Sequence, residues 1–281
     1  RLLTSIWEFP VRNRRTEVCS DMQFSDKIAP LKPSAIREIF KVLGDPSIIS
    51  LAGGNPAPET FPVKEFQTLS AKLYEENEKN ALQYGLTEDY LKKKKKITER
   101  LKEKLGIGRD FDETIVVTGG QQGVDLTCKI LCNEGDVVLC EDPSFIGALN
   151  AFRSYNTRLV GIPVDDCGMQ IDKLEQALKK EKKAKLIYTI PTFQNPTGVC
   201  MSLERRKALY ALAKKYGVII IEDNPYGELR FHGEEIPTIK SMDEDGIVVY
   251  CGSFSKILSP GMRIGFLCAQ KEIVSKIIVA K

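Results

Sequence analysis

From residue 114 to residue 268, short apolar and β-branched runs alternate with longer amphipathic segments. Some runs, such as the Val-Ile-Ile-Ile of 218–221, are apolar at every position. Strands of this kind are buried on both faces by crossover helices, so the pattern predicts a mostly parallel α/β sheet flanked by helices. The seven predicted strands are 114–118, 136–140, 158–164, 185–190, 218–222, 247–251 and 265–268.

Two of the amphipathic segments predict helices with distinct features. Segment 202–216 begins with a serine, a favoured N-cap, and is followed by Gly217, a favoured helix end. A lysine run at 92–96 leads into Ile, Leu and Leu at positions 97, 101 and 105. We interpret the run as the solvated face of an amphipathic helix, with an anion-binding patch as the alternative.

The composition narrows the class of protein. A chain of 281 residues with 42% hydrophobic content can bury a sizeable core. The net charge of +3 supplies no general drive toward nucleic acid or membranes, and no apolar run approaches the length of a membrane span. The eight cysteines mostly lie in apolar runs, and the single histidine, His232, is remote from Cys128 and Cys132. We therefore expect a cytoplasmic protein without a metal site and without a nucleic-acid or membrane partner.

Polar or glycine-rich groups follow several predicted strands, where ligands of parallel sheets bind. Thr-Gly-Gly-Gln at 118–121 opens a predicted helix, and its free amides favour a phosphate, although a tight turn without a ligand has the same pattern. Asp223 follows another strand, either as a site carboxylate or as a cap of a turn.

Lys256 lies in a short loop bounded by Ser253 and Pro260, between two predicted strands. Inside a cleft its amine would lose solvation and its pKa would fall, which is the state that a Schiff-base nucleophile needs, whereas a solvated loop lysine is the alternative. A phosphate on glycines, an aldehyde on a lysine and a cationic ring nitrogen on an aspartate together describe pyridoxal phosphate.

The same segments resemble a known family. Ser-Phe-Ser-Lys at 253–256, followed by Pro-Gly-Met-Arg-Ile-Gly at 260–265, is similar to the lysine signature of class I/II aminotransferases of fold type I. The segments 195–198, 223–226 and 84–85 match that family in order and spacing, and 51–56 resembles the branch of 2-aminoadipate and aromatic aminotransferases. The resemblance implies an α/β, fold type I aminotransferase-like architecture with an incomplete small domain.

The turn-rich stretch 51–62 gives a domain boundary. With the resemblance, residues 1–55 form an N-terminal arm and small-domain segment, and residues 56–281 form the pyridoxal-phosphate-binding large domain. The C-terminal part of the small domain, with its arginine for the substrate carboxylate, is expected beyond Lys281.

The resemblance also implies roles for individual residues. Lys256 would hold the cofactor as a Schiff base and move the substrate proton, and Asp223 would keep the pyridine nitrogen protonated. Tyr226 and Asn195 would bind the phenolic oxygen, and Phe145 would stack on the ring. The implied phosphate ligands are Gly119, Gly120, Gln121, Ser253 and Arg263.

Two further implied residues concern the substrate and the partner. Gly54 would contact the substrate together with Asn195, and Tyr84 would reach the phosphate of a neighbouring subunit, which implies a homodimer with shared active sites. Two departures from the family pattern are Asp89 with the lysine run, where glycine, proline, leucine and arginine are usual, and Phe145 in place of a tyrosine or tryptophan.

The function implied by the resemblance is transfer of an amino group from an amino acid to a 2-oxo acid by ping-pong half-reactions. Two alternatives remain: a pyridoxal-phosphate-dependent carbon-sulfur β-lyase, and the effector-sensing domain of a regulator with an aminotransferase-like fold.

Overall fold

A computed structural model describes residues 24, 25, 27–29, 47, 54–83, 85 and 91–281, and the following account concerns these residues. Their centre is an eight-stranded sheet in the order β1-β8-β7-β6-β5-β2-β3-β4. The strands are β1 (Asp112–Val117), β2 (Val137–Asp142), β3 (Arg158–Asp165), β4 (Gly168–Met169), β5 (Ala184–Thr189), β6 (Ile219–Asn224), β7 (Val248–Ser253) and β8 (Gly265–Gln270).

The prediction of a mostly parallel sheet is confirmed, with one strand more than predicted. Strands β7, β6, β5, β2 and β3 pair in parallel, whereas β8 is antiparallel to both of its neighbours. The extra strand is β4, which folds back antiparallel on β3 and pairs through only two residues. A strand of two residues is too short to produce a recognisable apolar run, so the pattern could not predict it.

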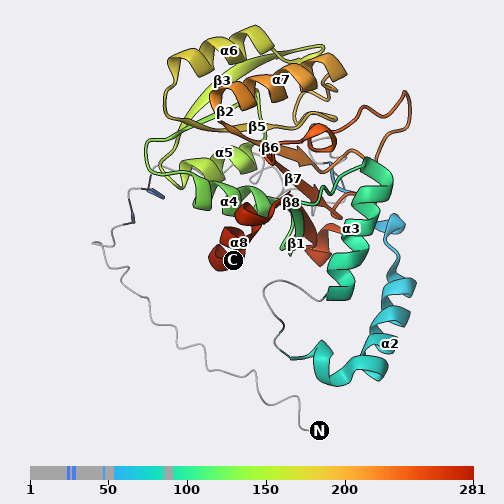
Figure 1. The fold of residues 1–281 in the computed structure, drawn as a ribbon. Coiled ribbons are helices and arrows are strands. Elements are labelled where there is room, and N and C mark those ends of the chain that lie inside the picture. Colours follow the sequence, from blue (N-terminus) through green and yellow to red (C-terminus); the bar gives the residue numbers. More distant parts are fainter. Residues whose placement is uncertain (1–23, 26, 30–46, 48–53, 84, 86–90) are drawn as a thin grey trace.

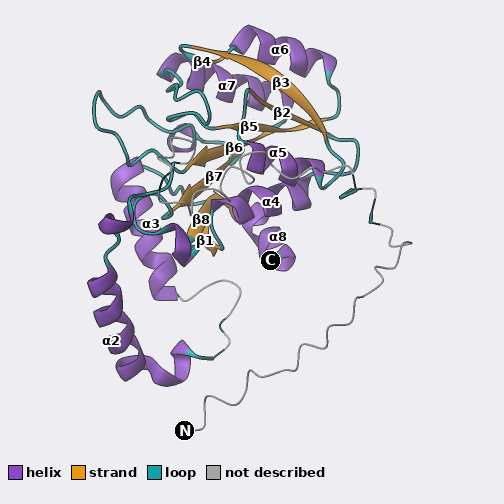
Figure 2. Cartoon of the chain, turned by 180° about the vertical axis from the view of Figure 1, so that it is seen from behind, coloured by secondary structure: helices purple, strands orange, loops and turns teal. Residues whose placement is uncertain are grey.

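Helices cover both faces of this sheet (Figure 1, Figure 2). On β2, Val138 and Cys140 pack into the cluster that includes α4, α5 and α8, whereas Val137 and Leu139 pack into the cluster of α6 and α7. This alternation is the two-residue period of a strand buried on both faces. The helices are α2 (Val63–Ala81), α3 (Leu91–Leu105), α4 (Gly120–Leu131), α5 (Ile146–Arg153), α6 (Ile171–Lys180), α7 (Leu203–Tyr216) and α8 (Lys271–Ala280).

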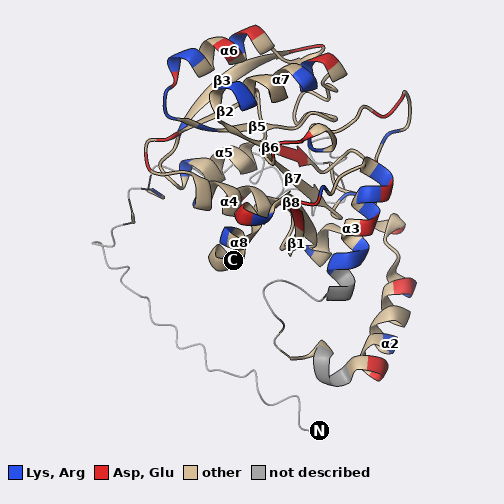
Figure 3. Cartoon of the chain, in the orientation of Figure 1, with Lys and Arg blue, Asp and Glu red and all other residues tan. Residues whose placement is uncertain are grey.

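The two predicted helices are confirmed. In α7 the Ser202 hydroxyl accepts a hydrogen bond from the Arg205 backbone N–H at 3.3 Å, and Gly217 ends the helix with a left-handed φ of 66°. In α3, Ile97 and Leu101 are buried against β1, β7 and β8. Of the lysine run, Lys95 and Lys96 are exposed and Lys94 is partly buried in an ion pair with Glu113 of β1, while the side chains of Lys92 and Lys93 lie outside the described residues. Blue segments mark the basic residues of α3 in Figure 3.

Helix α2 lies beside α3 and extends away from the sheet in both ribbon views (Figure 1, Figure 2). Its apolar side chains Leu69, Leu73 and Tyr74 are at least half exposed. Among the described helices, none is both long and apolar enough to cross a membrane. The described residues also contain no group of three His, Cys, Asp or Glu side chains placed to hold a metal ion.

Candidate active site

Three elements meet at the carboxyl ends of the central strands. Asp223 is the second-last residue of β6, and Ser253 is the last residue of β7. Gly119 is the N-cap of α4, and Gly120 is its first residue. A Cβ atom placed on Gly120 would lie 3.7 Å from the Ser253 Cβ and 4.0 Å from Asp223 Oδ1. The sequence-predicted residues of three separate segments are therefore neighbours.

The turn before α4 approaches β8 closely. Gly119 has a positive φ of 78°, and a Cβ atom there would collide with the guanidinium of Arg263. Gly265 pairs with both Val117 and Ser253, and a Cβ atom on it would lie 2.6 Å from the backbone carbon of Gly119. Glycine is thus required at these positions for the turn to rest on the sheet.

This turn has the properties of an anion site. The first amides of a helix have no partners within the helix, and the helix dipole places partial positive charge at the same end. The exposed guanidinium of Arg263 lies over Gly119, and Ser253, whose hydroxyl is hydrogen-bonded to the Ser255 hydroxyl at 2.9 Å, is next to Gly120. Together these groups can hold a phosphate.

The side chain of Gln121 is turned away from this position. Its Nε2 donates a hydrogen bond to the Gly147 carbonyl at 2.9 Å, in the first turn of α5. Phe145, the N-cap residue of α5, lies against the same glycine and packs beside the cluster of α4. Any contribution of Gln121 to the anion site would thus come from its backbone amide.

Asp223 is a buried carboxylate that is hydrogen-bonded to a buried tyrosine. The hydroxyl of Tyr188 donates a hydrogen bond to Asp223 Oδ2 at 2.8 Å. Burial raises the pKa of Asp223 from its ordinary value to about 6, the Tyr188 hydrogen bond opposes this rise, and the charge of Glu141 adds to it. A carboxylate in such surroundings gains from a cationic partner, because an opposite charge offsets the lost hydration.

Asn195 and Tyr226 form a pair of donors in the same region. The Asn195 side-chain amide donates a hydrogen bond to the Tyr226 hydroxyl at 3.1 Å. Asn195 lies in the turn after β5, and Tyr226 is two residues beyond β6. Since both groups can donate, the pair can bind an oxygen that carries negative charge.

Lys256 lies in the turn between β7 and β8. Its Nζ donates a hydrogen bond to the Gly54 carbonyl at 2.8 Å, which brings two sequence-predicted residues together across most of the chain. Partial burial lowers the pKa of Lys256, as a lysine nucleophile requires. Tyr84, the residue expected to reach a partner subunit, lies outside the described residues, and so does Asp89.

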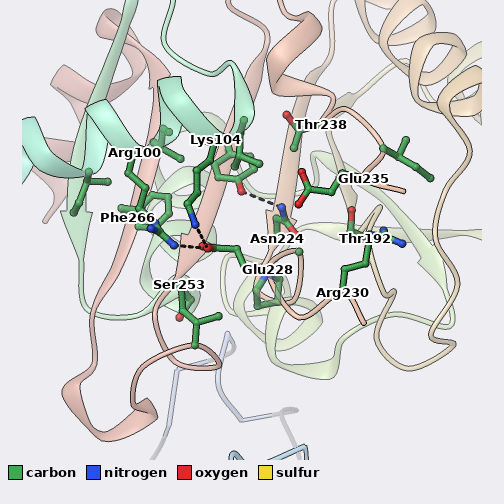
Figure 4. Close-up of a pocket in the computed structure, with 18 residues that line it drawn as sticks. Arg100, Lys104, Thr192, Asn224, Glu228, Arg230, Glu235, Thr238, Ser253 and Phe266 are labelled. Atoms are coloured by element: carbon green, nitrogen blue, oxygen red, sulfur yellow. Dashed lines mark hydrogen bonds and ion pairs between the residues drawn. The ribbon is translucent and has the colours of Figure 1, made fainter. Parts of the chain in front are cut away.

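A cavity of about 330 Å³ lies beside this site, between α3 and the segment that follows β6 (Figure 4). Ser253 is at its edge, and Arg100 and Lys104 of α3 both contact Glu228 across it. Asn224 donates a hydrogen bond to the Tyr250 hydroxyl at 3.0 Å on this side of the sheet. Sequence reasoning missed this cavity, because it depends on how α3 docks.

The geometry can be compared with known proteins. A family model described as aminotransferase class I and II matches residues 46–280. The match covers most of the chain, so the chain belongs to the class I and II aminotransferase family. The resemblance inferred from the lysine signature is thereby confirmed, and so is the fold class.

Several relatives are similar over most of this chain. Aromatic-amino-acid aminotransferase 1 of Thermococcus litoralis is 45% identical over 262 residues, which are 92% of this chain and 63% of the relative. The 2-aminoadipate transaminase of Thermus thermophilus is 39% identical over 254 residues, covering 89% of this chain and 62% of the relative. The solved structure of Pyrococcus horikoshii kynurenine aminotransferase matches with a TM-score of 0.86 at 41% identity, covering 92% and 64%. The chain thus spans less than two thirds of the length of each.

Proposed function

We propose that this chain is the cofactor-binding part of a pyridoxal-phosphate-dependent aminotransferase, which transfers an amino group from an amino acid to a 2-oxo acid. The observation that carries the proposal is the placement of the buried Asp223 carboxylate next to the glycine turn of α4 and Ser253. The names of the relatives, aromatic-amino-acid and 2-aminoadipate aminotransferases, support the reaction class.

The residues present fit the cofactor. Asp223 would face the ring nitrogen and favour its protonated form, and a pKa of about 6 for this carboxyl suits a charged hydrogen bond there. Asn195 and Tyr226 would donate to the phenolic oxygen, and Phe145 would stack on the ring. The phosphate ligands would be Gly119, Gly120, Gln121 through its amide, Ser253 and Arg263.

Lys256 would attach the cofactor covalently. When bound, pyridoxal phosphate supplies an electron sink for the bond that breaks at the substrate α-carbon. Once the substrate amine had displaced Lys256 from the cofactor, the freed Lys256 amine would remove the α-proton and deliver it to the cofactor C4′ atom. Gly54, whose carbonyl accepts a hydrogen bond from Lys256 Nζ, would lie on the substrate side together with Asn195.

The assembly and the location are part of the proposal. The exposed apolar face of α2, with Leu69, Leu73 and Tyr74, supports a homodimer, in which Tyr84 would complete the partner's phosphate site. The described cysteines are free, which supports a cytoplasmic location. Residues 56–281 would form the large domain, and residues 1–55 the arm and small-domain segment.

Two other functions would use a similar site. A carbon-sulfur β-lyase would release pyruvate and ammonia from a cysteine conjugate, and an effector-sensing domain would bind the cofactor without turnover. The curated names of the aminotransferase relatives favour transfer. Product analysis with an amino donor and a 2-oxo acid acceptor separates the three functions.

The covalent attachment is tested by reduction. After incubation with pyridoxal phosphate and borohydride, peptide mapping should place the pyridoxyl group on Lys256. Lys256→Ala should abolish the label, whereas a change at the exposed Lys271, which is bonded to the Asp110 carbonyl, should not affect it. A label on another lysine would overturn the assignment.

A further inference from the structure

The carboxylate of Glu141, at the end of β2, is buried with 2% exposure, and no role in the proposed reaction has been given to it. Its Oε1 accepts a hydrogen bond from the Thr189 hydroxyl at 2.6 Å. Its Oε2 accepts hydrogen bonds from the Ile190 backbone N–H at 3.1 Å and from Gln194 Nε2 at 3.0 Å. Removing a carboxylate from water is unfavourable in free energy, and the three hydrogen bonds to Glu141 offset that cost. The arrangement is therefore typical of a residue that holds other groups in position.

Gln194 connects this carboxylate to two loops. Besides Glu141, its Nε2 donates to the Pro143 carbonyl at 2.9 Å, in the loop that leads to Phe145. Its Oε1 accepts from the Thr197 backbone N–H at 2.8 Å and from the Thr197 hydroxyl at 2.7 Å. Both ends of the side-chain amide are therefore fully used.

The main chain of Gln194 closes the turn that carries Asn195. Its N–H donates to the Val199 carbonyl at 2.9 Å, and its carbonyl accepts from the Gly198 N–H at 2.6 Å. One buried side chain and its backbone thus join three features: the end of β2, the Pro143 loop and the Asn195 turn. None of these atoms would touch the cofactor.

We propose that Gln194 and Glu141 are positioning residues that fix the Asn195 turn against the Pro143 loop, which leads to Phe145. Asn195 and Tyr226 are thereby held in the position that binds the cofactor's phenolic oxygen. The inference rests on the proposed cofactor site and extends it by two residues. Preorganised donors of this kind keep their geometry without reorganisation when charge appears.

The geometry distinguishes hydrogen bonding from charge at position 141. In Glu141→Gln, the amide oxygen can accept from Ile190 and Gln194, and the amide nitrogen can donate to the Thr189 hydroxyl, because a hydroxyl is both donor and acceptor. The network survives without its charge. In Glu141→Met, the Ile190 N–H and Gln194 Nε2 lose their acceptor at position 141, and the hydrogen bond that joins β2 to Gln194 is lost.

The test uses the pH midpoint of the visible absorption change of the bound cofactor in the full-length protein. Donors to the phenolic oxygen stabilise its anionic form, so loosening them raises the midpoint. We expect Gln194→Met and Glu141→Met to raise it by about one unit, since a hydrogen bond to a charged group contributes about that much. Glu141→Gln removes the charge, which also acts on Asp223, but keeps the hydrogen bonds, so it should shift the midpoint clearly less than Glu141→Met, which removes both.

Two controls separate positioning from general destabilisation. Tyr210→Phe removes hydrogen bonds to Asp243 and Asp245 far from the site, and it should lower the melting temperature without moving the midpoint. Thr197→Val removes a hydroxyl that donates to Gln194 Oε1 at 2.7 Å and accepts from the Val199 N–H at 3.4 Å, both within the Asn195 turn. Because the side chain is exposed, the variant should fold normally and raise the midpoint by a smaller amount.

The outcomes are distinguishable. Unchanged midpoints in Gln194→Met and Thr197→Val, or an equal shift in Glu141→Gln and Glu141→Met, would overturn the positioning role. Absence of any pH-dependent cofactor band in the unaltered protein would instead refute the proposed cofactor site itself.

Discussion

At the scale of single residues, Asp223 shows a conflict between stability and function. Its pKa of about 6 in the folded chain lies above the ordinary value of 3.8, because burial disfavours the charged form. The carboxyl group therefore contributes fully to folding stability below about pH 4, and that contribution is lost as the pH rises through 6. The difference of about two pKa units corresponds to about 3 kcal/mol.

Asp223→Asn should reveal this cost in the cofactor-free protein. An amide cannot ionise and can still accept the Tyr188 hydrogen bond, so the variant should be more stable than the unaltered protein at pH 8 by up to about 3 kcal/mol. The advantage should vanish near pH 4. Denaturant unfolding at both pH values measures it, and turnover of the variant should fall, because the ring nitrogen loses its anionic partner. A stability difference independent of pH would contradict the raised pKa.

At the scale of elements, the site depends on how closely β8 approaches the turn before α4. Gly265 contacts the backbone of Gly119 and Gly120, and it lies between Val117 and Ser253 in the sheet. The proposed phosphate site is therefore built on a backbone-to-backbone contact that leaves no room for a methyl group.

Gly265→Ala should weaken both folding and cofactor binding. The added Cβ would meet the Gly119 carbon at 2.6 Å and the Gly120 nitrogen at 2.7 Å, and backbone atoms cannot swing aside as a flexible side chain does. We expect a loss of about 1–3 kcal/mol in stability, as for other overpacked sites, and at least tenfold weaker cofactor binding. Gly261→Ala is the matched control, because its Cβ would find only the Ser259 hydroxyl at 3.8 Å. Equal cofactor affinity of the two variants would refute the close-contact argument.

The elements also show what a sequence can and cannot predict here. Strands β2 and β6 could be predicted because burial on both faces leaves a continuous apolar run, and α7 because its caps are local. The position of Asp223 followed from its place at a strand end. The role of Gln194 could not be predicted, because its partners Glu141 and Pro143 are more than 50 residues away in the chain.

A similar limit applies to Gln121. The glycines beside it gave a correct prediction of a turn at a helix start, since backbone freedom is a local property. The direction of the Gln121 side chain depends instead on the Gly147 carbonyl of α5, which docks only in the folded chain. The cavity beside Ser253 depends in the same way on α3.

At the scale of the whole molecule, binding of a substrate carboxylate by the 281-residue chain depends on which of its arginines are available. Binding of a substrate carboxylate is suited to a free, planar guanidinium. Arg205 forms a two-pronged ion pair with Asp165 at 2.6 and 2.8 Å. Arg230 lies over the Phe193 ring, contacts the His232 carbonyl and lines the cavity beside Ser253, and its buried Nε has no hydrogen-bond partner among the described residues.

The other arginines in 91–281 also have partners. Arg206 is buried and donates to backbone carbonyls and to a threonine, and Arg263 lies over the glycine turn. Those with partners on the surface are Arg100, Arg109, Arg153 and Arg158. Within this part of the chain, a two-pronged carboxylate contact would therefore compete with existing contacts, even at Arg230, whose Nη atoms contact the His232 carbonyl and Cys200 Sγ while its Nε is unpaired.

We accordingly expect the purified 281-residue chain to bind pyridoxal phosphate but to transaminate poorly. The residues proposed to contact the cofactor from Gly119 to Arg263 all lie in the described part of the chain, whereas the arginines described there already contact other groups, so a substrate carboxylate would not be clamped with its α-proton against Lys256. Losing two charged hydrogen bonds would cost about 10²- to 10⁴-fold in kcat/KM. A panel of amino donors measures this loss, with the Thermococcus litoralis relative, of which the chain covers 63%, as the active reference. Turnover equal to the reference would show that one of these paired arginines exchanges its partner for the substrate.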